Sequence, residues 1–514
     1  MSVLQQHVEI ERLLTLKSDH ELKRMGKMFA TNNNKYFYDT GTGKVLLLDQ
    51  DSYEIMDALF NRSEIKSIDD LKEVLNGRAI EKFGLAVAEE KLFRAFKPDK
   101  LYTLGHYEDL ERQVNSEFRQ LILELTGRCN LRCGYCIYNE DCDLNRNFND
   151  DDMTIEVAKA AIDYTAQHTK EKAAVTFYGG EPLLRFDLLK WSIEYSLDIM
   201  SGKALSFSLT TNLTLVTKDI AEYLAAVPNL SVVCSLDGPE YVQNSYRKYS
   251  NGYGSFSKAI RGLELLCEAF KNSRNVLSIN AVFAPPYSQQ KLDDINSFFQ
   301  KLTFLPKGID INITYAAKGS IPDTKLSIEE VPKDEQNMIN PLWDWMTDQI
   351  KQHPSIREEE NTIYAALVEK ILIDVENRFV ADEPSEFYPF NGCCVPGARR
   401  LYVNTKGDLY ICERVGNSPS IGNIFDGIDF GRIHNFYVED YSRGTIENCK
   451  NCWAIRLCST CYIDSYTESG FHRENKRKQC SSQKKSILED LVFYHAVRET
   501  SPEKLEFLKN ARVF

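Results

Sequence analysis

Apolar and polar positions follow a repeating pattern in the central part of this chain of 514 residues. Between residues 118 and 315, short apolar runs are followed by stretches in which apolar residues recur every three or four positions, such as Ile155, Ala158 and Ile162. The pattern predicts strands at Gln120–Thr126, Ala174–Tyr178, Leu205–Thr211, Ser231–Leu236, Leu277–Phe283 and Asp310–Thr314. Six repeats of strand then helix predict a parallel, barrel-like α/β sheet, with active-site groups just after the strands' C-terminal ends.

The flanking regions predict different structures. Residues 1–105 indicate a small α/β module with strands at 27–30, 35–39 and 44–48 and helices near 51–61, 68–76 and 79–95. The turn Thr40-Gly-Thr-Gly43 joins the last two strands as a hairpin. Three strands followed by three helices is the winged-helix order. Residues 320–390 are polar and helical in pattern and indicate a connector, whereas 485–514 predict a closing helix or tail.

Length and charge narrow the class of protein. A chain this long forms two or three domains rather than one core. The net charge of −13 argues against bulk binding to nucleic acid or to an anionic membrane. The first twenty residues lack a signal-peptide pattern, and no apolar run is long enough to span a membrane. We therefore expect a cytoplasmic protein, in which clustered cysteines are metal ligands before they are disulfides.

The 14 cysteines are clustered. The first group is Cys129-Asn-Leu-Arg-Cys133-Gly-Tyr-Cys136, directly after the first expected strand of the sheet. A cubane iron–sulfur cluster has four irons and is usually held by four cysteines. Three cysteines leave one iron open to another ligand, whereas a structural zinc site would need a closed set of four. This loop therefore predicts a cluster that takes part in chemistry.

Two further motifs follow the second and fourth expected strands, Phe177-Tyr-Gly-Gly-Glu-Pro182 and Cys234-Ser-Leu-Asp-Gly-Pro239. Together with the cysteine loop they resemble the radical S-adenosylmethionine (radical SAM) enzymes, in which the open iron binds the cofactor. The resemblance implies a partial (β/α)6 barrel, with a 4Fe–4S cluster on the three cysteines. It implies that the cofactor S-adenosyl-L-methionine is bound by Tyr135, Gly179, Gly180, Glu181, Asn212, Ser235 and Arg247. Leu213 departs from the pattern, since glycine is commoner at that position.

The second cysteine group lies near the C-terminus. Its block Cys449-Lys-Asn-Cys452-Trp-Ala-Ile-Arg-Leu-Cys458-Ser-Thr-Cys461 resembles the SPASM extension of radical SAM enzymes, although the last gap is two residues where three is commoner. The resemblance implies two auxiliary 4Fe–4S clusters, hence three clusters in all. One would be held by Cys449, Cys452, Cys458 and Cys480, and the other by Cys394, Cys412 and Cys461, with Cys393 as a further candidate. A pair of structural zinc knuckles is the alternative. Cys142, Cys234 and Cys267 are expected to be small buried apolar residues.

The resemblance extends over nearly the whole chain. Residues 1–105 resemble the leader-peptide recognition elements of ribosomal-peptide modifying enzymes, with a packing or dimerisation module as the alternative. Residues 106–320 would form the barrel, 321–390 a helical connector, and 391–514 the SPASM domain with a C-terminal helix. The details Asn391-Gly-Cys-Cys-Val-Pro-Gly and Cys412-Glu-Arg-Val-Gly are similar to those of the Cys-rich-peptide (ranthipeptide) thioether maturases of the PapB-like type.

These maturases join a peptide cysteine sulfur to a carbon of an acceptor residue, often Asp or Glu. The resemblance implies a Cys-rich precursor peptide bound through its leader, and a flavodoxin or ferredoxin as electron donor. It implies that a 5′-deoxyadenosyl radical removes hydrogen from the acceptor carbon, with no protein acid or base. A sulfatase-maturing oxidase that forms formylglycine is the second enzymatic interpretation. A non-catalytic iron–sulfur electron carrier is the third, and the Gly179-Gly180-Glu181 motif argues against it.

Overall fold

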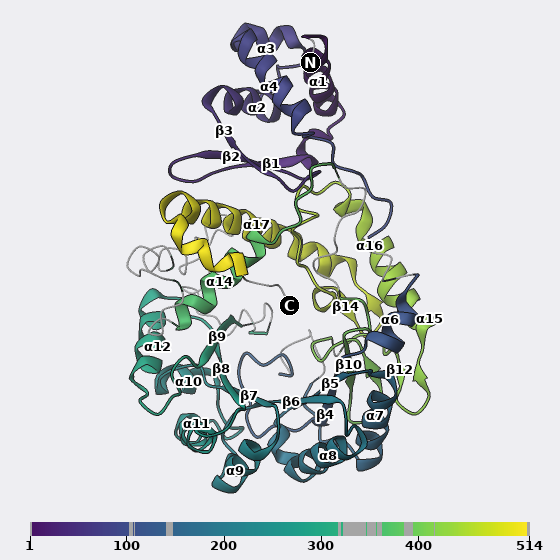
Figure 1. Cartoon of the computed structure of the whole chain (residues 1–514), viewed down its shortest axis with the longest axis vertical. Coiled ribbons are helices and arrows are strands. Elements are labelled where there is room, and N and C mark those ends of the chain that lie inside the picture. The colour runs from purple at the N-terminus through teal and green to yellow at the C-terminus, as the bar shows by residue number, and fades with distance from the viewer. Residues whose placement is uncertain are drawn as a thin grey trace.

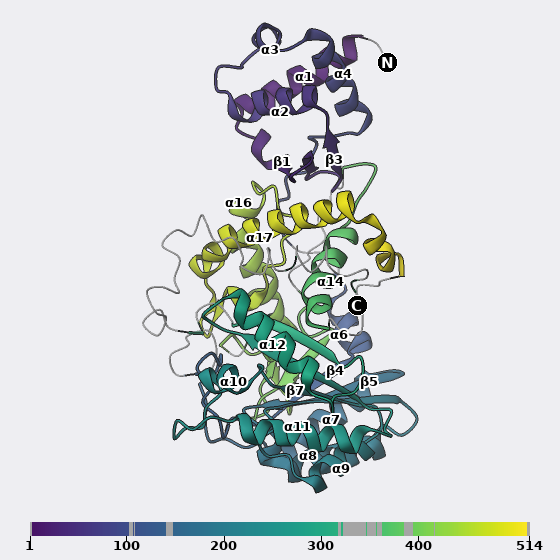
Figure 2. The same ribbon diagram turned by 90° about the vertical axis from the view of Figure 1, so that its left-hand side faces the viewer.

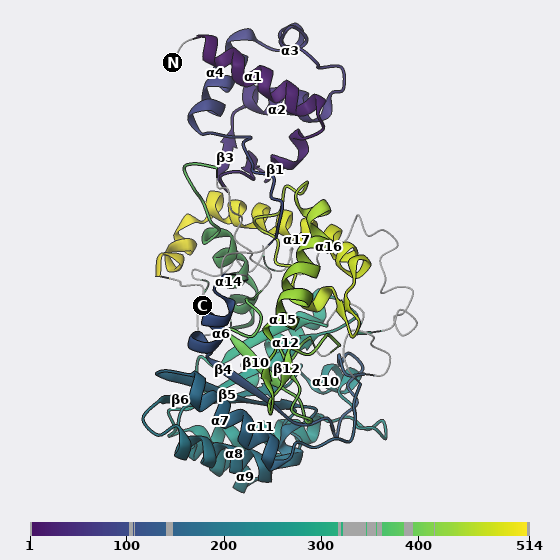
Figure 3. The same cartoon turned by 90° about the vertical axis from the view of Figure 1, so that its right-hand side faces the viewer.

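The computed structural model describes residues 3–101, 106, 108–139, 147–316, 320–321, 346, 356, 362–384, 394–415 and 417–510. Figure 1 shows a small N-terminal module above a curved sheet, with a long C-terminal helix between them. The same order is seen in the two views turned by 90° (Figures 2 and 3). No helix in the described part of the chain is long and apolar enough to cross a membrane.

The N-terminal module comprises residues 3–95 and has its own hydrophobic core. Its elements are α1 (Val3–Ser18), the 3-10 turn η1 (Leu22–Arg24), β1 (Gly26–Ala30), β2 (Lys35–Asp39), β3 (Val45–Leu48), α2 (Gln50–Asn61), α3 (Ile68–Val74) and α4 (Gly77–Glu89). The strands form an antiparallel sheet in the order β1-β2-β3. The predicted strands and the three helices after them are present, but α1 comes before them and was not predicted. It buries Ile10, Leu13 and Leu14, which recur at helical spacing.

The central region is a parallel sheet of six strands. They are β4 (Gln120–Thr126), β5 (Lys172–Gly179), β6 (Ala204–Thr211), β7 (Leu230–Ser235), β8 (Val276–Phe283) and β9 (Asp310–Tyr315), paired in that order. All six predicted strands are present, with bounds that differ by at most two residues. In β5, β6 and β8, alternate residues such as Val175 and Phe177 are buried against the outer helices, while Thr176 and Ser208 face the concave side and share a hydrogen bond of 2.6 Å.

Helices cover the outer face of this sheet (Figures 1 and 2). They are α6 (Leu110–Glu117), α7 (Ile155–His168), α8 (Phe186–Ile199), α9 (Lys218–Ala226), α10 (Glu240–Tyr246), α11 (Phe256–Phe270) and α12 (Gln289–Lys301), with the short 3-10 helix η2 (Pro182–Arg185) after β5. Several begin at a capping side chain, as at Thr154 and Thr217, whose hydroxyls accept a hydrogen bond from the backbone N–H three residues on.

The C-terminal region adds to the same sheet. Its elements are α14 (Thr362–Glu376), β10 (Arg400–Val403), β11 (Leu409–Tyr410), β12 (Gly422–Asn423), β13 (Gly427–Ile428), α15 (Phe430–Arg432), the π-helix η4 (Ile433–Glu439), α16 (Asp440–Cys449), the 3-10 helix η5 (Tyr462–Asp464), β14 (Tyr466–Thr467), β15 (Gly470–Phe471), α17 (Arg473–Thr500) and η6 (Pro502–Asn510). β10 runs parallel to β4, and β11 pairs antiparallel with β10, so the sheet has eight strands rather than the predicted six. The predicted closing helix begins at Arg473, twelve residues earlier than expected.

Candidate active site and auxiliary cysteine sites

The cysteine loop, residues 127–136, leaves the C-terminal end of β4 and brings three thiols together. Cys136 N–H donates to the Cys133 carbonyl at 3.0 Å, and Leu131 N–H points at the Cys129 sulfur at 3.4 Å. Burial raises the pKa of the Cys129 and Cys133 thiols to about 12, and the thiols raise one another's pKa further. Thiolates in this position therefore need a nearby cation, and bound iron supplies that compensation.

The two glycines after β5 let the backbone approach this loop. A side chain at Gly180 would place its Cβ only 2.0 Å from the Arg128 carbonyl oxygen, and one at Gly179 would lie 2.3 Å from the Thr126 oxygen. Gly179 also has a φ of +134°, which L side chains rarely adopt. Gly180 N–H donates to Thr126 and Glu181 N–H to Arg128, both at 2.9 Å. The glycines thus hold the cysteine loop against the end of β5.

Glu181 is buried beside the loop and tied to the next strand. Its carboxylate accepts from Thr211 Oγ1 at 2.8 Å, from Asn212 N–H at 2.7 Å and from Leu183 N–H at 3.1 Å. Burial raises the pKa of Glu181 to about 7, although these hydrogen bonds oppose the shift. The negative charge of Glu181 also raises the pKa of Cys129, so the two side chains lie close together.

Asn212 lies at the end of β6 beside Cys129. Its Nδ2 is 3.9 Å from the Cys129 sulfur and donates to Asn130 Oδ1 at 2.9 Å. Leu213, which stands where glycine is commoner, has a φ of +70° and is fully buried. The left-handed backbone is therefore present although the side chain is leucine.

Arg247 and Tyr135 meet at a carboxylate that the sequence prediction had not singled out. Asp237 accepts from Tyr135 OH at 2.5 Å, from Arg247 Nε at 3.2 Å and from Val282 N–H at 3.0 Å. The Arg247 guanidinium carbon lies 5.6 Å from the Tyr135 ring centre, and its positive charge opposes the rise in the pKa of Cys133 that burial causes. Asp237 belongs to the quoted Ser-Leu-Asp-Gly motif, but two of its partners, Tyr135 and Val282, lie 102 and 45 positions away in the sequence. Ser235, the last residue of β7, is buried at the same edge of the sheet.

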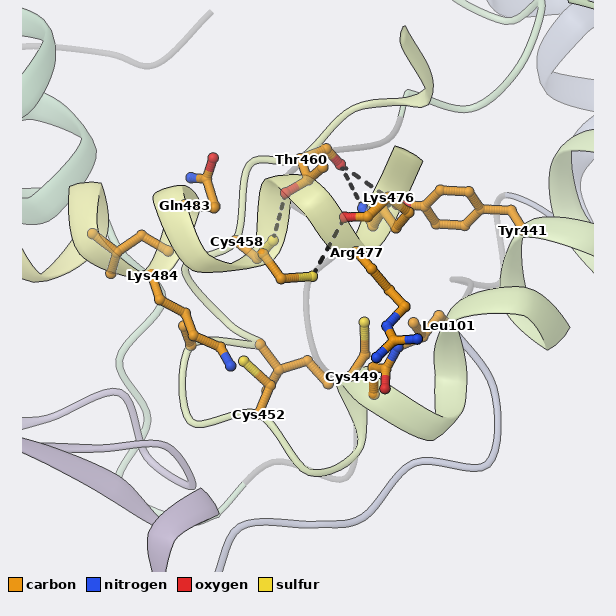
Figure 4. A pocket seen from close by; sticks show the side chains of 15 residues that line it. Leu101, Tyr441, Cys449, Cys452, Cys458, Thr460, Lys476, Arg477, Gln483 and Lys484 are labelled. Carbon is orange, nitrogen blue, oxygen red and sulfur yellow. Dashed lines mark hydrogen bonds between the residues drawn. The ribbon is translucent and has the colours of Figure 1, made fainter. Parts of the chain in front are cut away.

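In the C-terminal region, four thiols line one cavity of about 240 Å³, shown in Figure 4. They belong to Cys449 at the end of α16, Cys452 and Cys458 in the loop that follows, and Cys480 on α17. Burial raises the pKa of Cys449 to about 12, while Lys476, which lines the same cavity, lowers it. Lys476 is buried and donates to Tyr441 OH at 2.6 Å. We call this the four-cysteine cavity.

Its shape bears on the metal that it fits. Four sulfurs around one zinc ion lie only about 3.8 Å apart, because the Zn–S distance is about 2.3 Å. Within the described ranges, no group of three or more His, Cys, Asp or Glu side chains is arranged to hold a single metal ion. The four thiols surround an open space instead, which suits the larger four-iron cluster that all-thiolate sites hold.

The third predicted set is unevenly buried. Cys394 is exposed, and its carbonyl lies 3.3 Å from His106 Nε2, whereas Cys412 and Cys461 are half-buried. Burial raises the pKa of Cys412 to about 12, and its sulfur lies 3.1 Å from Glu413 Oε2. Cys393 and Cys142 lie outside the described residues. Cys234 and Cys267 are both buried, as expected.

The loop that carries Cys412 reaches the cysteine loop. Tyr138, two residues after Cys136, donates through its hydroxyl to the Glu413 carbonyl at 3.5 Å. Tyr178, the residue before Gly179, is raised in pKa to about 12 by burial and by the nearby Glu413 and Cys136. The Cys412 segment and the cysteine loop are therefore neighbours.

Comparison with known proteins identifies the family. The model of the radical SAM superfamily matches residues 123–299. The serine-type anaerobic sulfatase-maturating enzyme of Bacteroides thetaiotaomicron is 33% identical over 355 residues, which cover 64% of this chain and 79% of that enzyme. The chain belongs to the radical SAM superfamily. Its cofactors are S-adenosylmethionine and a 4Fe–4S cluster, and the donor set fits them: the neighbouring thiols of the cysteine loop, with Glu181 near Cys129 and Arg247 near Cys133.

Other relatives agree. The cysteine-type anaerobic sulfatase-maturating enzyme of Clostridium novyi is 25% identical over 354 residues, or 66% of this chain and 86% of that enzyme. The structure of anSMEcpe with bound AdoMet aligns with a TM-score of 0.53 at 18% identity, over 76% of this chain and all of that one. Its complex with AdoMet and the Kp18Cys peptide gives a TM-score of 0.50 at 17% identity, over 76% and 99% of the two chains. At this identity, the likeness shows the α/β fold with its parallel sheet.

Proposed function

We propose that this radical SAM enzyme is a peptide maturase that forms thioether crosslinks in a ribosomally made, Cys-rich precursor peptide. The bonds would join cysteine sulfurs to carbons of acceptor residues, often Asp or Glu, as in the PapB-like ranthipeptide maturases. The observation that carries the proposal is the contact of the Cys412 segment with the cysteine loop, through Tyr138 and the Glu413 carbonyl. On this proposal, Cys412, as one ligand of an incomplete cluster-ligand set, would lie beside the site where the cofactor is cleaved.

Cofactor cleavage and binding of the substrate thiolate would take place at two neighbouring sites. Cys129, Cys133 and Cys136 would hold the first cluster. The edge formed by Gly179, Gly180, Glu181, Asn212, Ser235, Arg247 and Tyr135 would hold S-adenosylmethionine. When bound, the cluster and cofactor supply reductive cleavage and a fragment able to remove a hydrogen atom. Asp237 orients Arg247, whose planar guanidinium suits a carboxylate, and Tyr135, whose ring lines the same place.

Cys394, Cys412 and Cys461 would hold an auxiliary cluster through three ligands, with Cys393 as a further candidate, and Cys449, Cys452, Cys458 and Cys480 another through four. A three-ligand set leaves a position for a substrate thiolate, because metal binding lowers a thiol's pKa. The substrate then loses a hydrogen atom from the acceptor carbon and a proton from sulfur. A flavodoxin or ferredoxin would supply the electron for cofactor cleavage, and the one electron left by the coupling would leave through the auxiliary sites.

The N-terminal module supplies a place for the leader peptide. β3 pairs only with β2 among the described strands, so its outer edge is unpaired. Asp39 N–H donates to the Lys44 carbonyl, and hydrogen-bonded pairs in an antiparallel ladder recur at every second residue. The N–H groups of Val45 and Leu47 therefore point outward. An extended leader added as a fourth strand would bond to them.

Leu47 allows a sharp test, because its side chain is 63% exposed. Leu47→Pro removes the outward N–H without breaking a bond to β2, whereas Leu47→Ala trims the side chain and keeps the N–H. We expect the proline variant to bind a fluorescent leader peptide about tenfold more weakly than the alanine variant, as the loss of one strand hydrogen bond predicts. S-adenosylmethionine cleavage without peptide should be equal in both. Equal leader affinities would rule out strand addition at β3.

A second candidate function is sulfatase maturation, and the 33% identity to the Bacteroides enzyme favours it. The two functions give different products from a peptide. A sulfatase maturase would convert a cysteine or serine residue to formylglycine, whose aldehyde reacts with hydrazine reagents, whereas a thioether does not. Incubation of the holoenzyme with a sulfatase-type peptide and with the precursor peptide would show which substrate is changed. Aldehyde on the sulfatase peptide, with no change to the precursor, would favour the second function.

A further inference from the structure

The turn between β2 and β3 is buried, which is unusual for a hairpin. Such turns normally lie at the surface, yet Asp39, Thr40 and Thr42 are at most 1% exposed. Two distant segments cover the turn. One is residues 378–381, after α14, where Ala381 N–H donates to Thr42 at 2.9 Å and Arg378 Nε to Gly43 at 3.1 Å. The other is the loop between two cysteines of the four-cysteine cavity.

That loop, residues 452–458, contacts the turn at two places. Thr40 Oγ1 donates to the Trp453 carbonyl at 2.8 Å, and the Tyr38 and Trp453 rings meet edge to face with centres 6.0 Å apart. Arg456 is 2% exposed and lies 5.0 Å from the Phe379 ring centre, and a Cβ at Gly43 would lie 3.4 Å from its Nε. Burial raises the pKa of the Asp39 carboxyl, and the positive charge of Arg456 opposes that shift. The two contacts of Trp453, with Thr40 and with Tyr38, join residues more than 400 positions apart.

Backbone hydrogen bonds restrain the 452–458 loop, so a displacement of the backbone at one end is transmitted to the other. Cys452 N–H donates to Cys449, Ile455 N–H to Cys452 and Leu457 N–H to Ala454, at 3.0 to 3.3 Å. These consecutive turns leave little freedom between Trp453, Arg456 and the two flanking cysteines. The opposite end of the β2–β3 hairpin, near the start of β2, rests on α17, the helix that carries Cys480, where Tyr36 OH donates to Glu499 at 2.6 Å.

We propose that docking of the N-terminal module and loading of the four-cysteine cavity are thermodynamically coupled, with Thr40, Trp453 and Arg456 as the positioning residues that link them. The assembled cavity holds the loop in the shape that receives the turn, and the docked turn holds Cys452 and Cys458 in place. Coupling is reciprocal, so each partner stabilises the other by the same factor. The role of the module as leader site rests on the proposed function, whereas the coupling itself rests only on a cluster in the four-cysteine cavity.

The first arm of the test uses a hydroxyl that touches no cysteine. Thr40→Val in the full-length holoenzyme removes the bond to Trp453 and keeps the side chain's shape, and Thr40→Ser restores the hydroxyl. We expect a chelator to remove iron from the four-cysteine cavity about 2- to 10-fold faster in the valine variant, as one lost hydrogen bond predicts. The serine variant should behave as wild type. Iron from this cavity is identified by its absence in Cys452→Ser/Cys458→Ser.

The second arm runs in the opposite direction. In Cys452→Ser/Cys458→Ser, which cannot load the cavity, trypsin should cut the segment after the module, at Lys100, at least fivefold faster than in wild type, the lower end of coupling factors seen between sites. A third arm adds the synthetic leader of the precursor, which should slow iron loss in wild type and do so less in Arg456→Met. We expect Arg456→Lys to retain part of this effect, because lysine keeps the positive charge of Arg456 but not its packing.

The outcomes separate the coupling from the proposed function. Unchanged iron loss in Thr40→Val, or unchanged trypsin cleavage in the double serine variant, would overturn the coupling. A leader that fails to bind wild type, with the first two arms as expected, would leave the coupling in place and count against leader recognition. Equal leader effects in wild type and Arg456→Met would remove Arg456 from the link.

Discussion

The cysteine loop depends on a close backbone approach, and Gly180→Ala tests that dependence. A Cβ at residue 180 would lie 2.0 Å from the Arg128 oxygen, 2.4 Å from the Arg128 carbonyl carbon and 2.9 Å from Cys129 N. Ordinary non-bonded carbon contacts are about 3.5 Å. The loop must therefore retreat by at least about 1 Å, and Cys129 follows Arg128 directly. A displacement of about 1 Å at a reacting centre costs about 100-fold in rate.

We expect reductive S-adenosylmethionine cleavage by Gly180→Ala to fall about 100-fold, with loss of up to about four irons per chain. The assays are 5′-deoxyadenosine formation under dithionite and anaerobic iron analysis. The matched control is Gly77→Ala, since a Cβ there meets nothing within 4 Å. It should cleave the cofactor as wild type does. Wild-type iron content and cleavage in Gly180→Ala would refute the close-approach reasoning, and an unchanged circular dichroism spectrum would exclude general unfolding.

Three further changes test other parts of the account. Leu213→Gly relieves a φ of +70°, worth about 1–2 kcal/mol, but deletes a fully buried side chain, worth about 2–5 kcal/mol, so thermal melting should fall. Asp237→Asn should weaken S-adenosylmethionine binding about tenfold by calorimetry, because Arg247 loses its charged partner. Burial and nearby acids raise the folded pKa of Asp490 to about 7, so ionisation of this carboxyl destabilises the folded protein increasingly as pH rises from about 4 to 7. Asp490→Asn should therefore raise the melting temperature at pH 8 and not at pH 4.

The sequence predicts the central sheet well because the apolar pattern of each strand and each helix is contained within that segment. Each strand of β4 to β9 is an apolar run followed by an amphipathic helix, and neither feature needs knowledge of the partners. The missed helix α1 has a narrow apolar stripe around Ile10, Leu13 and Leu14 in an otherwise polar segment. β10 and β11 are only four and two residues long, and pairing with β4 rather than local propensity makes them strands.

The candidate site divides in the same way. The cysteine loop and the glycine pair are local motifs, and their residues lie together as expected. Asp237 stands within a quoted motif, yet its role depends on Tyr135, which is 102 positions away. The contact of Thr40 with Trp453 spans 413 positions and leaves no periodic trace in either segment. The buried turn could therefore be found only in three dimensions, where a hairpin expected at the surface is covered.

The most direct test of the central claim is the product formed from the full-length precursor peptide. The holoenzyme is incubated anaerobically with the precursor, S-adenosylmethionine and reduced flavodoxin, and the peptide is then treated with iodoacetamide and sequenced by tandem mass spectrometry. The account predicts a loss of two hydrogens for each crosslink, at cysteines that no longer react with iodoacetamide. Cysteines that all remain reactive, or that are converted to aldehydes, would contradict it.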